Sequence, residues 1–437
     1  MTTLKLNILN KNYKNLKKIY SDKIDSKNKI IVKYYKLNTK KPEICPFCKE
    51  NHEHIHIHGY YSKCLKNSKI DNFTEVFNIK ITRYLCTKCK KTFSDKFENQ
   101  YQNYRITQNY NDQILEDFNK NTVLNDLKFK YKLPFPIIKS IFKNHITISN
   151  FNKIKELKSG FVEKLSIDEK KIGNKFYTFF IDLDKKQVIF YCEGRDSGTV
   201  KKFCDFYGKN FIKNIKTVSI DMAKSYNLGV SKYIPNAKIV NDKFHVSSNF
   251  YKNYVKKILE NEIKKQKKSI KIMNKNAQNE ENFDEISKKT LEDLIEINKK
   301  TISCKFLLRK NRKNIDENDK KTIDFASENS ENIKEIVEIK YKIDELLDSK
   351  DYEYCKKEWL NLFEKCKNST IPELRRFYKF NCKYIETLPN SALFDISNGF
   401  IEGNNRNINL YYNRARGFKD IDYFLNLIMY FSYKKSC

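Results

Sequence analysis

We expect a multidomain protein with a β-rich N-terminal module, three short helices, and a mixed α/β core that an all-helical segment interrupts. Three observations support this expectation. Two pairs of cysteines lie among alternating apolar residues near the N-terminus. Strand and helix patterns then alternate between residues 164 and 246. From residue 251 to about residue 390 the pattern is helical and contains almost no strand.

The charge of the chain indicates a polyanionic partner. Its 437 residues include 86 Lys and Arg against 54 Asp and Glu, which gives a formal net charge of +32. Such an excess of positive charge steers a protein toward nucleic acid or an anionic membrane surface. Hydrophobic residues make up 40% of the chain, so a wholly disordered basic tail is excluded.

The sequence contains no pattern typical of a membrane-spanning helix. No run of about 18 apolar residues occurs, and the first residues lack the continuous apolar segment of a signal peptide. We therefore expect a cytoplasmic protein without a membrane partner. Most of the 12 cysteines are scattered, which is typical of reduced thiols inside the cell.

The N-terminal part is expected to comprise an arm and a small β module. Residues 1–40 are polar and rich in Lys and Asn, and we expect them to form an extended or weakly ordered arm. In residues 41–104, apolar and polar residues alternate, for example over residues 74–81. This period of two predicts strands.

Two Cys-x-x-Cys pairs within this module predict a zinc site. Two residues between the thiols of a pair allow both sulfurs to reach one ion, and two such pairs complete a tetrahedral site. Strands between the pairs would make the module a zinc ribbon. The alternative is four unrelated buried thiols. The predicted ligands are Cys45, Cys48, Cys86 and Cys89.

A histidine-rich run follows the first cysteine pair. Its four histidines alternate with other residues, so on a strand they would share one face. They are either further metal ligands or a polar strand surface. The run contains His52, His54, His56 and His58.

Residues 105–150 show the spacing of three short helices. Pro134 and Pro136 precede the third apolar group, where proline suits the first turn of a helix. Three helices with tight connections fit a helix-turn-helix, which places one helix in the major groove of DNA. A generic three-helix packing unit has the same pattern.

The α/β core begins in residues 160–250 with the order strand, strand, strand, helix, strand, helix, strand. Three antiparallel strands followed by right-handed crossovers predict a mixed sheet. An all-helical insertion is expected over residues 251–395, and residues 396–437 are expected to return to core helices. The expected strands lie at residues 165–167, 176–181, 187–191, 217–220 and 238–240.

Acidic residues end two strands of the expected core. Asp168 ends the first strand and Asp221 ends the fourth. If these strands are neighbours, both carboxylates emerge at the same edge of the sheet. Carboxylates there can hold Mg²⁺ or Mn²⁺ against substrate phosphates, and Glu402, early in the last helical block, would complete the set. Taken singly, each acid fits equally well as a turn, helix-cap or exposed helix-start carboxylate.

Further polar residues flank these acids. Asp242 ends the next strand and is a rival for the second acid, and Lys243 and His245 follow it. His245 would contact a phosphate or be an ordinary core or surface histidine. Basic residues close behind Glu402 would bind DNA phosphates or form only a solvated face. These residues are Arg406, Arg414 and Arg416.

Six motifs follow one another from Ile167 to Phe418. They read IDEKKIGNKFYTFFIDLD, EGRDSGTVKKF, VSIDMAKSY, IPNAKIVNDKFHV, FLLRKNRKNID and SNGFIEGNNRNINLYYNRARGF. In this order they resemble the ISL-three family of insertion-sequence transposases, which are DDE enzymes with an RNase H-like core. The resemblance extends back to the CPFC cysteine pair. It implies an RNase H-like core and a DDE triad formed by Asp168, Asp221 and Glu402.

The resemblance implies DNA transposition. Such a protein would bind the terminal inverted repeats of its insertion sequence and perform Mg²⁺-dependent phosphodiester hydrolysis and strand transfer, with zinc in a structural role. Its partner would be double-stranded DNA of the element ends and the target, bound by a homodimer or larger assembly at the bacterial nucleoid. Two alternatives stay open: a catalytically inactive or co-opted zinc and helix-turn-helix DNA-binding protein, and a coating protein driven by charge alone.

Overall fold

The computed structural model describes residues 13, 15–120, 124–222, 224–279, 285–394, 399–414 and 418–434. Within these ranges, side chains are not described for residues 277–279, 399–402, 404, 414 and 434. The chain divides into two compact units, residues 1–147 and residues 148–437. The boundary falls inside the helix α3 (Phe135–Lys158).

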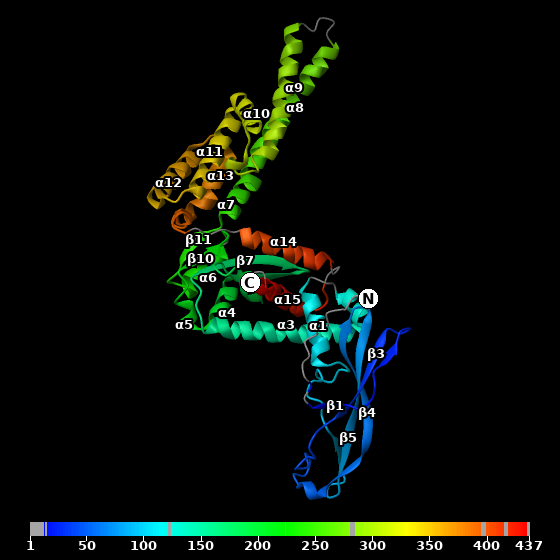
Figure 1. Ribbon diagram of the computed structural model, residues 1–437. Coiled ribbons are helices and arrows are strands. Elements are labelled where there is room, and N and C mark those ends of the chain that lie inside the picture. Colours follow the sequence, from blue (N-terminus) through cyan, green and yellow to red (C-terminus); the bar gives the residue numbers. More distant parts are fainter. Residues whose placement is uncertain are drawn as a thin grey trace. The chain divides into compact units, whose positions relative to one another are not determined.

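The first unit is built on a six-stranded sheet (Figure 1). Its strands are β1 (Leu16–Lys18), β2 (Lys23–Asp25), β3 (Ile30–Leu37), β4 (Ile55–Ile70), β5 (Phe73–Cys86) and β6 (Thr92–Ser94). Four of them lie in the order β1-β3-β5-β4, while β2 pairs with β3 and β6 pairs with β5. The long strands β4 and β5 form an antiparallel hairpin, and one face of it buries Leu65, Phe77 and Ile79 in the core of the unit.

Part of the expected N-terminal arm belongs to this sheet. Residues 16–37 hold three strands, and β3 pairs in parallel with β5 from Ile30 opposite Thr74 to Lys36 opposite Lys80. The chain is therefore extended over these residues, which is one of the two expected alternatives, but it pairs within the sheet instead of forming a separate arm. The physical reason is that the partner of β3 lies far along the sequence, so the local excess of Lys and Asn hides a strand that pairing stabilises.

Three helices follow the sheet where the sequence predicts them. They are α1 (Gln108–Asn119), α2 (Leu124–Tyr131) and α3. The hydroxyl of Thr107 caps α1 by accepting the backbone N–H of Tyr110. Tyrosines join α1 and α2, because Tyr110 donates to the carbonyl of Tyr131 at 2.8 Å and Tyr131 donates to Asp117 at 2.7 Å. The use of these helices as a helix-turn-helix stays a prediction.

The second unit is built on a five-stranded mixed sheet (Figure 1). Its strands are β7 (Lys164–Ile172), β8 (Lys175–Asp182), β9 (Gln187–Glu193), β10 (Thr217–Ile220) and β11 (Lys238–Asn241). They lie in the order β11-β10-β7-β8-β9. The strands β7, β8 and β9 are antiparallel neighbours, whereas β7, β10 and β11 are parallel to one another. The expected mixed sheet and its sequence of strands are confirmed.

Helices cover both faces of this sheet. They are α4 (Ser197–Tyr207), α5 (Lys209–Ile212), α6 (Lys224–Tyr233), α14 (Gly399–Arg414) and α15 (Ile421–Lys434). On one face, Leu165 of β7 shares a core with Val200 of α4. On the other face, Phe179 of β8 shares a core with Ile408 of α14 and Phe424 of α15. The helix that follows the insertion in sequence, α14, therefore packs against the sheet.

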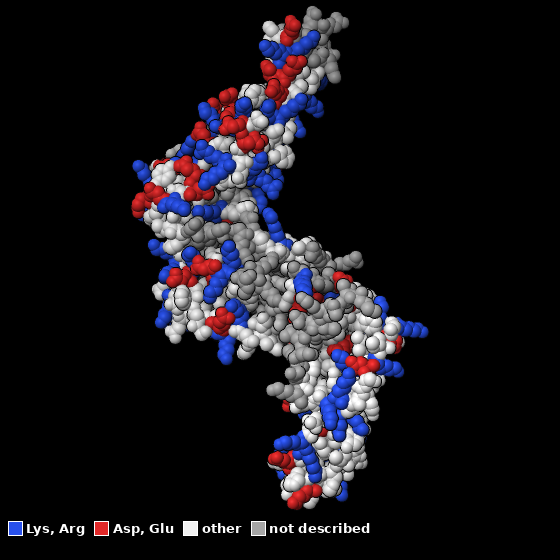
Figure 2. Space-filling view, in the orientation of Figure 1, with Lys and Arg blue, Asp and Glu red and all other residues white. Residues whose placement is uncertain are grey.

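The insertion between β11 and α14 contains helices and no strand among its described residues. The helices share a core that includes the fully buried Trp359. Figure 2 shows acidic and basic side chains intermixed over α10, α11 and α12. Over the part of the chain that the structure describes, every helix is too short or too polar to cross a bilayer. The insertion comprises α7 (Lys243–Phe250), the π-helical turn η2 (Tyr251–Val255), α8 (Lys256–Asn279), α9 (Glu285–Leu307), η3 (Arg312–Asn314), α10 (Glu317–Glu328), α11 (Glu331–Asp348), α12 (Tyr352–Asn368), α13 (Pro372–Asn381), η4 (Cys382–Tyr384) and η5 (Pro389–Ala392).

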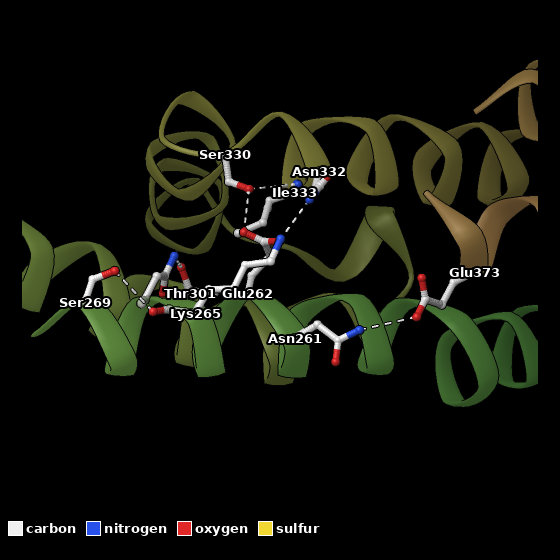
Figure 3. A network of polar contacts seen from close by, with 10 residues as sticks. Asn261, Glu262, Lys265, Ser269, Thr301, Ser330, Asn332, Ile333 and Glu373 are labelled. Carbon is white, nitrogen blue, oxygen red and sulfur yellow. Dashed lines mark hydrogen bonds and ion pairs between the residues drawn. The ribbon is translucent and has the colours of Figure 1, made fainter. Parts of the chain in front are cut away.

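A polar network fixes the first turns of α8 to neighbouring helices (Figure 3). The carboxylate of Glu262 on α8 accepts hydrogen bonds from Asn332 at 2.9 Å and from Ser330 at 3.2 Å. The hydroxyl of Ser330 also caps α11 by accepting a backbone N–H of its first turn. Asn261 donates to Glu373 of α13 at 3.3 Å. The helices α8 and α9, which lie side by side, therefore extend from an anchored base (Figure 1).

A second anchor of the insertion is the buried ion pair between Lys340 and Asp344 on α11. Asp344 also accepts the backbone N–H of Arg312 at 3.0 Å and the hydroxyl of Ser247 at 3.3 Å. We expect Asp344→Ala to lower the free energy of unfolding by about 3–5 kcal/mol, because it leaves the ammonium of Lys340 buried without its partner. Urea denaturation measures this loss.

The exposed ion pair between Lys365 and Glu338, at 2.7 Å, provides the control for this prediction. Glu338→Gln should cost less than about 1 kcal/mol, because water screens an exposed pair. The double variant Lys340→Met/Asp344→Leu removes both buried charges and should recover most of the lost stability. Equal, small losses in Asp344→Ala and Glu338→Gln would show that the buried pair does not anchor the insertion.

Candidate functional site

Three aspartates lie level with one another on neighbouring strands of the second unit: Asp221 directly follows β10 and Asp242 directly follows β11, whereas Asp168 lies in the middle of β7. The expectation that Asp168 ends its strand is wrong, because β7 continues to Ile172 as the partner of β8. The strand β10 pairs in parallel with β7 on one side and with β11 on the other. When each register is continued by one or two residues, Asp221 comes level with Asp168 on β7 and with Asp242 after β11. Asp221 and Asp242 directly follow the ends of their strands, so this pairing brings their backbones level with Asp168. We call these three residues the acidic edge.

Asp168 is held by a residue of α14. The side-chain amide of Asn405 donates to the Oδ2 atom of Asp168 at 2.7 Å. Burial raises the pKa of Asp168. The hydrogen bond from Asn405 and the charge of His245 oppose this shift, whereas the carboxylate of Asp242 adds to it. The helix that returns from the insertion therefore contributes directly to the surroundings of the acidic edge.

Asp242 begins the first helix of the insertion. Its buried carboxylate accepts the backbone N–H groups of Phe244 at 2.8 Å and of His245 at 3.2 Å, so it is the N-cap of α7. Its Oδ2 atom lies 3.8 Å from the Nε2 atom of His245. Lys243, the first residue of α7, is half-buried and lines a groove of the insertion. The rival for the second acid thus has a structural role at a helix start.

Glu169 is a further candidate that the sequence pattern does not single out. It follows Asp168 on β7, so its side chain points to the opposite face of the sheet. Tyr226 of α6 donates to its Oε2 atom at 3.3 Å, and the hydroxyl groups of Tyr226 and Thr178 lie 2.9 Å apart. Burial and the charge of Asp221 raise the pKa of Glu169. The IDE motif contains both carboxylates, but sequence alone does not tell which of them meets α14.

The remaining predicted residues of this site lie on or after α14. Glu402 belongs to α14, but its side chain lies outside the described residues, as do the side chain of Arg414 and the whole of Arg416. Arg406 is exposed on the same helix. Asn405 stands within the NGFIEGNN motif, three residues after Glu402, and sequence reasoning did not select it. The one sequence feature that could have indicated Asn405 is its position, because it is a polar residue close to the predicted acid Glu402.

The four predicted zinc ligands converge in the first unit. The pairing of β4 with β5 sets Ile55 opposite Cys86, and the backbone N–H of Thr87 donates to the carbonyl of His54 at 2.8 Å. These contacts bring the two cysteine pairs together. All four ligand atoms lie within 4.8 Å of one another, and they are the Sγ atoms of Cys45, Cys48, Cys86 and Cys89.

The backbone around the two cysteine pairs is alike. Lys49 and Lys90 directly follow the pairs and have positive φ values of 63° and 58°. Although burial raises it, hydrogen bonds from the backbone N–H groups of Cys48 and Phe47 lower the pKa of Cys45 to about 6. The thiolate is the form that binds zinc, so this backbone favours a bound metal ion.

The histidine-rich run does not form one strand face. A short 3₁₀ helix, η1 (His52–His54), precedes the strand, and only His56 and His58 lie on β4. A β-bulge between Ile57 and Gly59 further disturbs the alternation. The expectation of four histidines on one strand face is therefore wrong, because the chain leaves the first cysteine pair through a 3₁₀ turn before β4 begins.

Among the residues that the structure describes, the cysteines form the only group of three or more metal-ligating side chains whose ligand atoms converge to this extent. Four thiolates are a common ligand set of structural zinc sites, so this group fits zinc. The carboxylates of Asp168, Asp221 and Asp242 share an edge without closing into such a group. Their chemistry is that of oxygen ligands for a hard cation.

Comparison with known proteins decides the family. A model of a transposase family matches residues 165–428, which are 264 of the 437 residues. The chain belongs to the ISL-three (ISL3) transposase family. The matched part of this ISL-three transposase contains the five-stranded sheet, the insertion and α14, so the acidic edge lies inside it.

A curated relative agrees with this family. The transposase for insertion sequence element IS1001 of Bordetella parapertussis is 29% identical over 99 residues. The match covers 22% of this chain, and it spans about a quarter (24%) of the length of that relative.

Proposed function

We propose that this ISL-three transposase cleaves and joins DNA at an RNase H-like core. The single observation that carries the proposal is the hydrogen bond from Asn405 to Asp168. It joins α14, the helix of the NGFIEGNN motif, to the strand of the IDE motif, although the whole insertion separates the two in sequence. The strand order β11-β10-β7-β8-β9, with its antiparallel and parallel halves, supports the RNase H-like interpretation.

We assign the catalytic acids to Asp168, Asp221 and Glu402. Asp221 directly follows the carboxyl end of β10, and the register places it level with Asp168 on the parallel neighbour β7. Open α/β sheets form their sites at such strand ends. Glu402 precedes Asn405 by three residues on α14, and residues so spaced share one side of a helix. Because Asn405 contacts Asp168, this spacing supports Glu402 as a third ligand at the acidic edge.

The assigned acids fit Mg²⁺ or Mn²⁺, which prefer carboxylate oxygens. When bound, such ions activate the attacking hydroxyl group and stabilise the leaving oxygen of a phosphodiester. Asp168 would supply its carboxylate in the ionised form, which a nearby cation favours over the protonated form that burial favours. Asp242 is already engaged as the cap of α7, so we assign it to positioning His245.

Two displacement steps would occur at the acidic edge. Water attacks the phosphorus at the element end, the bond to the 3′ oxygen breaks, and the element strand leaves with a free 3′-hydroxyl. This hydroxyl then attacks a phosphodiester of the target DNA and displaces a second 3′ oxygen. Lys243, His245 and Arg406 would neutralise the phosphate charge during both steps.

The first unit would bind the DNA of the element. Its zinc ribbon and its three helices would contact the terminal inverted repeats, with the helices acting as a helix-turn-helix. Two element ends must be joined to one target, so we propose a homodimer or larger assembly on the DNA. The reaction would take place in the cytoplasm, where bacterial DNA lies.

A nicking assay tests this proposal. The substrate is a duplex that carries one inverted repeat of the element with its flanking DNA, and Mg²⁺ starts the reaction. We expect a nick at the repeat boundary that requires the metal ion. Binding of the repeat without any cleavage would overturn the proposal and favour a co-opted DNA-binding protein.

The variant Asn405→Ala should shift the pH dependence of nicking. It removes a hydrogen bond that lowers the pKa of Asp168, so this pKa should rise. Since the ionised carboxylate is needed to hold a cation, the acidic limb of the pH–rate profile should move to higher pH. Asn407→Ala on the same helix is the control and should leave the profile unchanged. A uniform loss of rate at every pH would contradict this role of Asn405.

A further inference from the structure

A groove in the helical insertion lies beside the acidic edge. It has a volume of about 800 Å³, and neither Asp168 nor Asp221 lines it. Its walls come from α7, from the π-helical turn η2, from the start of α8, from the end of α9 with the residues that follow it, and from the end of α11. The groove therefore needs an explanation separate from that of the acids.

The lining of this groove is strongly basic. Its one acidic residue among the described lining is Asp348, which pairs with Lys313 at 3.1 Å. Three of the cations also pair with acids outside the lining: Lys305 with Glu260 and Lys310 with Asp319 at 2.7 Å, and Lys256 with Glu260 at 3.9 Å. Positive charge is still in excess. The cationic lining residues are Lys243, Lys252, Lys256, Lys305, Arg309 and Lys310.

This positive charge is a local feature of the insertion. Residues 317–368, which contain α10, α11 and α12, carry fourteen Asp or Glu against ten Lys or Arg. Figure 2 shows mixed charge over these helices. The cations of the groove come instead from the first residue of α7, from η2, from the first turn of α8, and from the end of α9 with the residues that follow it. A cleft lined by one sign of charge concentrates a ligand of the opposite sign, so the groove fits a polyanion.

Aromatic side chains are exposed among these cations. Phe244 is 52% exposed and Phe306 is 67% exposed, and both line the groove. Tyr251 lines it as well and is held in place because its hydroxyl donates to the carbonyl of Lys305. Cations that follow a phosphate backbone, together with aromatic rings that stack on bases, are the combination with which proteins bind single-stranded nucleic acid.

The groove begins next to the acidic edge. Its lining residues Lys243 and Phe244 directly follow Asp242, and the backbone N–H of Phe244 donates to the carboxylate of Asp242 at 2.8 Å. A strand that continues from a phosphate bound at the acidic edge along α7 therefore meets this groove.

We propose that this groove binds an unpaired DNA strand beside the cleavage site. The phosphates contact the lining lysines and arginine, and the bases stack on Phe244 and Phe306. A duplex does not use these rings in this way, because the faces of its bases are covered by their neighbours. The inference rests on the proposed function, since it makes the groove the place that holds DNA opened next to the scissile phosphate.

Fluorescence anisotropy with a fluorescein-labelled oligo(dT) strand tests the groove. The full chain is used with Asp168→Asn as background, so that no cleavage occurs. We expect Phe306→Ala to weaken binding about tenfold through loss of a base stack. Lys252→Gln/Lys256→Gln should weaken binding and flatten the slope of log affinity against log salt by about 1.4, because each phosphate contact of a single strand contributes about 0.7.

Matched controls come from exposed residues of the second unit outside the groove. Phe161→Ala and Lys267→Gln/Lys268→Gln should bind oligo(dT) as tightly as the parent does. Unchanged oligo(dT) affinity in Phe306→Ala and in Lys252→Gln/Lys256→Gln would overturn the inference. An equal loss on a blunt duplex would overturn it too, because it would indicate a surface that binds phosphates alone.

The binding assay tests the groove, and the nicking assay tests the proposed catalysis, so either proposal can be rejected without the other. Weaker oligo(dT) binding in the groove variants, combined with a parent protein that never nicks, would retain the groove and reject the proposed catalysis. Nicking by the parent combined with unchanged oligo(dT) binding in the groove variants would retain the catalysis and reject the groove.

Discussion

The variant Asp168→Asn should lower the rate of Mg²⁺-dependent nicking by about 10³-fold or more. A bound metal ion stabilises the charge that develops in the transition state by several kcal/mol. Each loss of about 1.4 kcal/mol lowers the rate tenfold. The neutral amide keeps the shape of the side chain and can still accept the hydrogen bond from Asn405, but it lacks the charge that holds a cation. The single-turnover rate of the first strand cut measures the loss.

The same variant should fold at least as stably as the parent. Burial raises the pKa of Asp168, so the folded metal-free protein binds a proton there more readily than the unfolded chain does. The free energy of unfolding of the metal-free protein therefore falls as the pH rises from the usual pKa range of an aspartate through the raised pKa that Asp168 has in the folded state. The substituted amide is uncharged at every pH and avoids this loss. The Tm of metal-free Asp168→Asn at neutral pH should equal or exceed that of the parent.

Asp182→Asn is the matched control for this variant. Asp182 is a buried carboxylate of the same sheet whose pKa burial also raises. It lies on β8 opposite Leu165, near the start of β7, whereas Asp168 lies in the middle of β7 opposite Phe179. Its substitution should leave nicking close to the parent rate. Equal losses of activity in both variants, or a loss in Asp168→Asn that follows a fall in Tm, would show that the assignment of Asp168 is wrong.

The variant Cys86→Ser should release zinc and unfold the zinc-binding module. Cys86 is fully buried at the end of β5, and a hydrogen bond from the backbone N–H of Cys89 lowers its pKa, which favours the thiolate form that binds zinc. Structural zinc contributes about 10–16 kcal/mol of apparent binding free energy in zinc-finger peptides, which exceeds the net stability of many domains. Metal analysis should find a zinc ion in the parent and none in the variant, and proteases should cut residues 41–104 faster.

Cys64→Ser provides the control for the zinc site. Cys64 is an exposed cysteine on β4 of the same sheet. Its substitution should change neither the zinc content nor the protease resistance. Zinc retained by Cys86→Ser would argue against a four-cysteine site. Zinc lost without faster proteolysis would argue against its structural role.

Local patterns predicted much of this fold. Alternation over residues 74–81 marks part of β5, and short apolar runs mark the five strands of the second unit. The cysteine pairs were predictable because two residues between thiols already decide whether both sulfurs reach one ion. Asp168 and Asp221 were predicted to lie together because each was expected to end a short strand. The parallel pairing of β7 with β10 does bring them level, although β7 continues past Asp168 to Ile172.

Features that depend on distant partners were not predictable. Lysines in and around β3 obscure its apolar pattern in the sequence. The strand β5, which stabilises β3 by pairing with it, lies far along the chain. Asn405 is an amide on a helix with many possible partners, and only the path of the chain around the insertion brings it to Asp168. The prediction that the histidine-rich run forms one strand was wrong, because His52 and His54 lie in the 3₁₀ turn η1. Alternation alone does not reveal such a turn.

A crystal structure of the protein with Mn²⁺, located by anomalous scattering, tests the assembly of the three acids most directly. The proposed site predicts an anomalous peak about 2.1 Å from carboxylate oxygens of Asp168 and Asp221, with Glu402 contributing a further ligand. A peak bound by Asp168 and Asp242 with Glu402 turned away, or peaks only at other surfaces, would contradict the proposed triad.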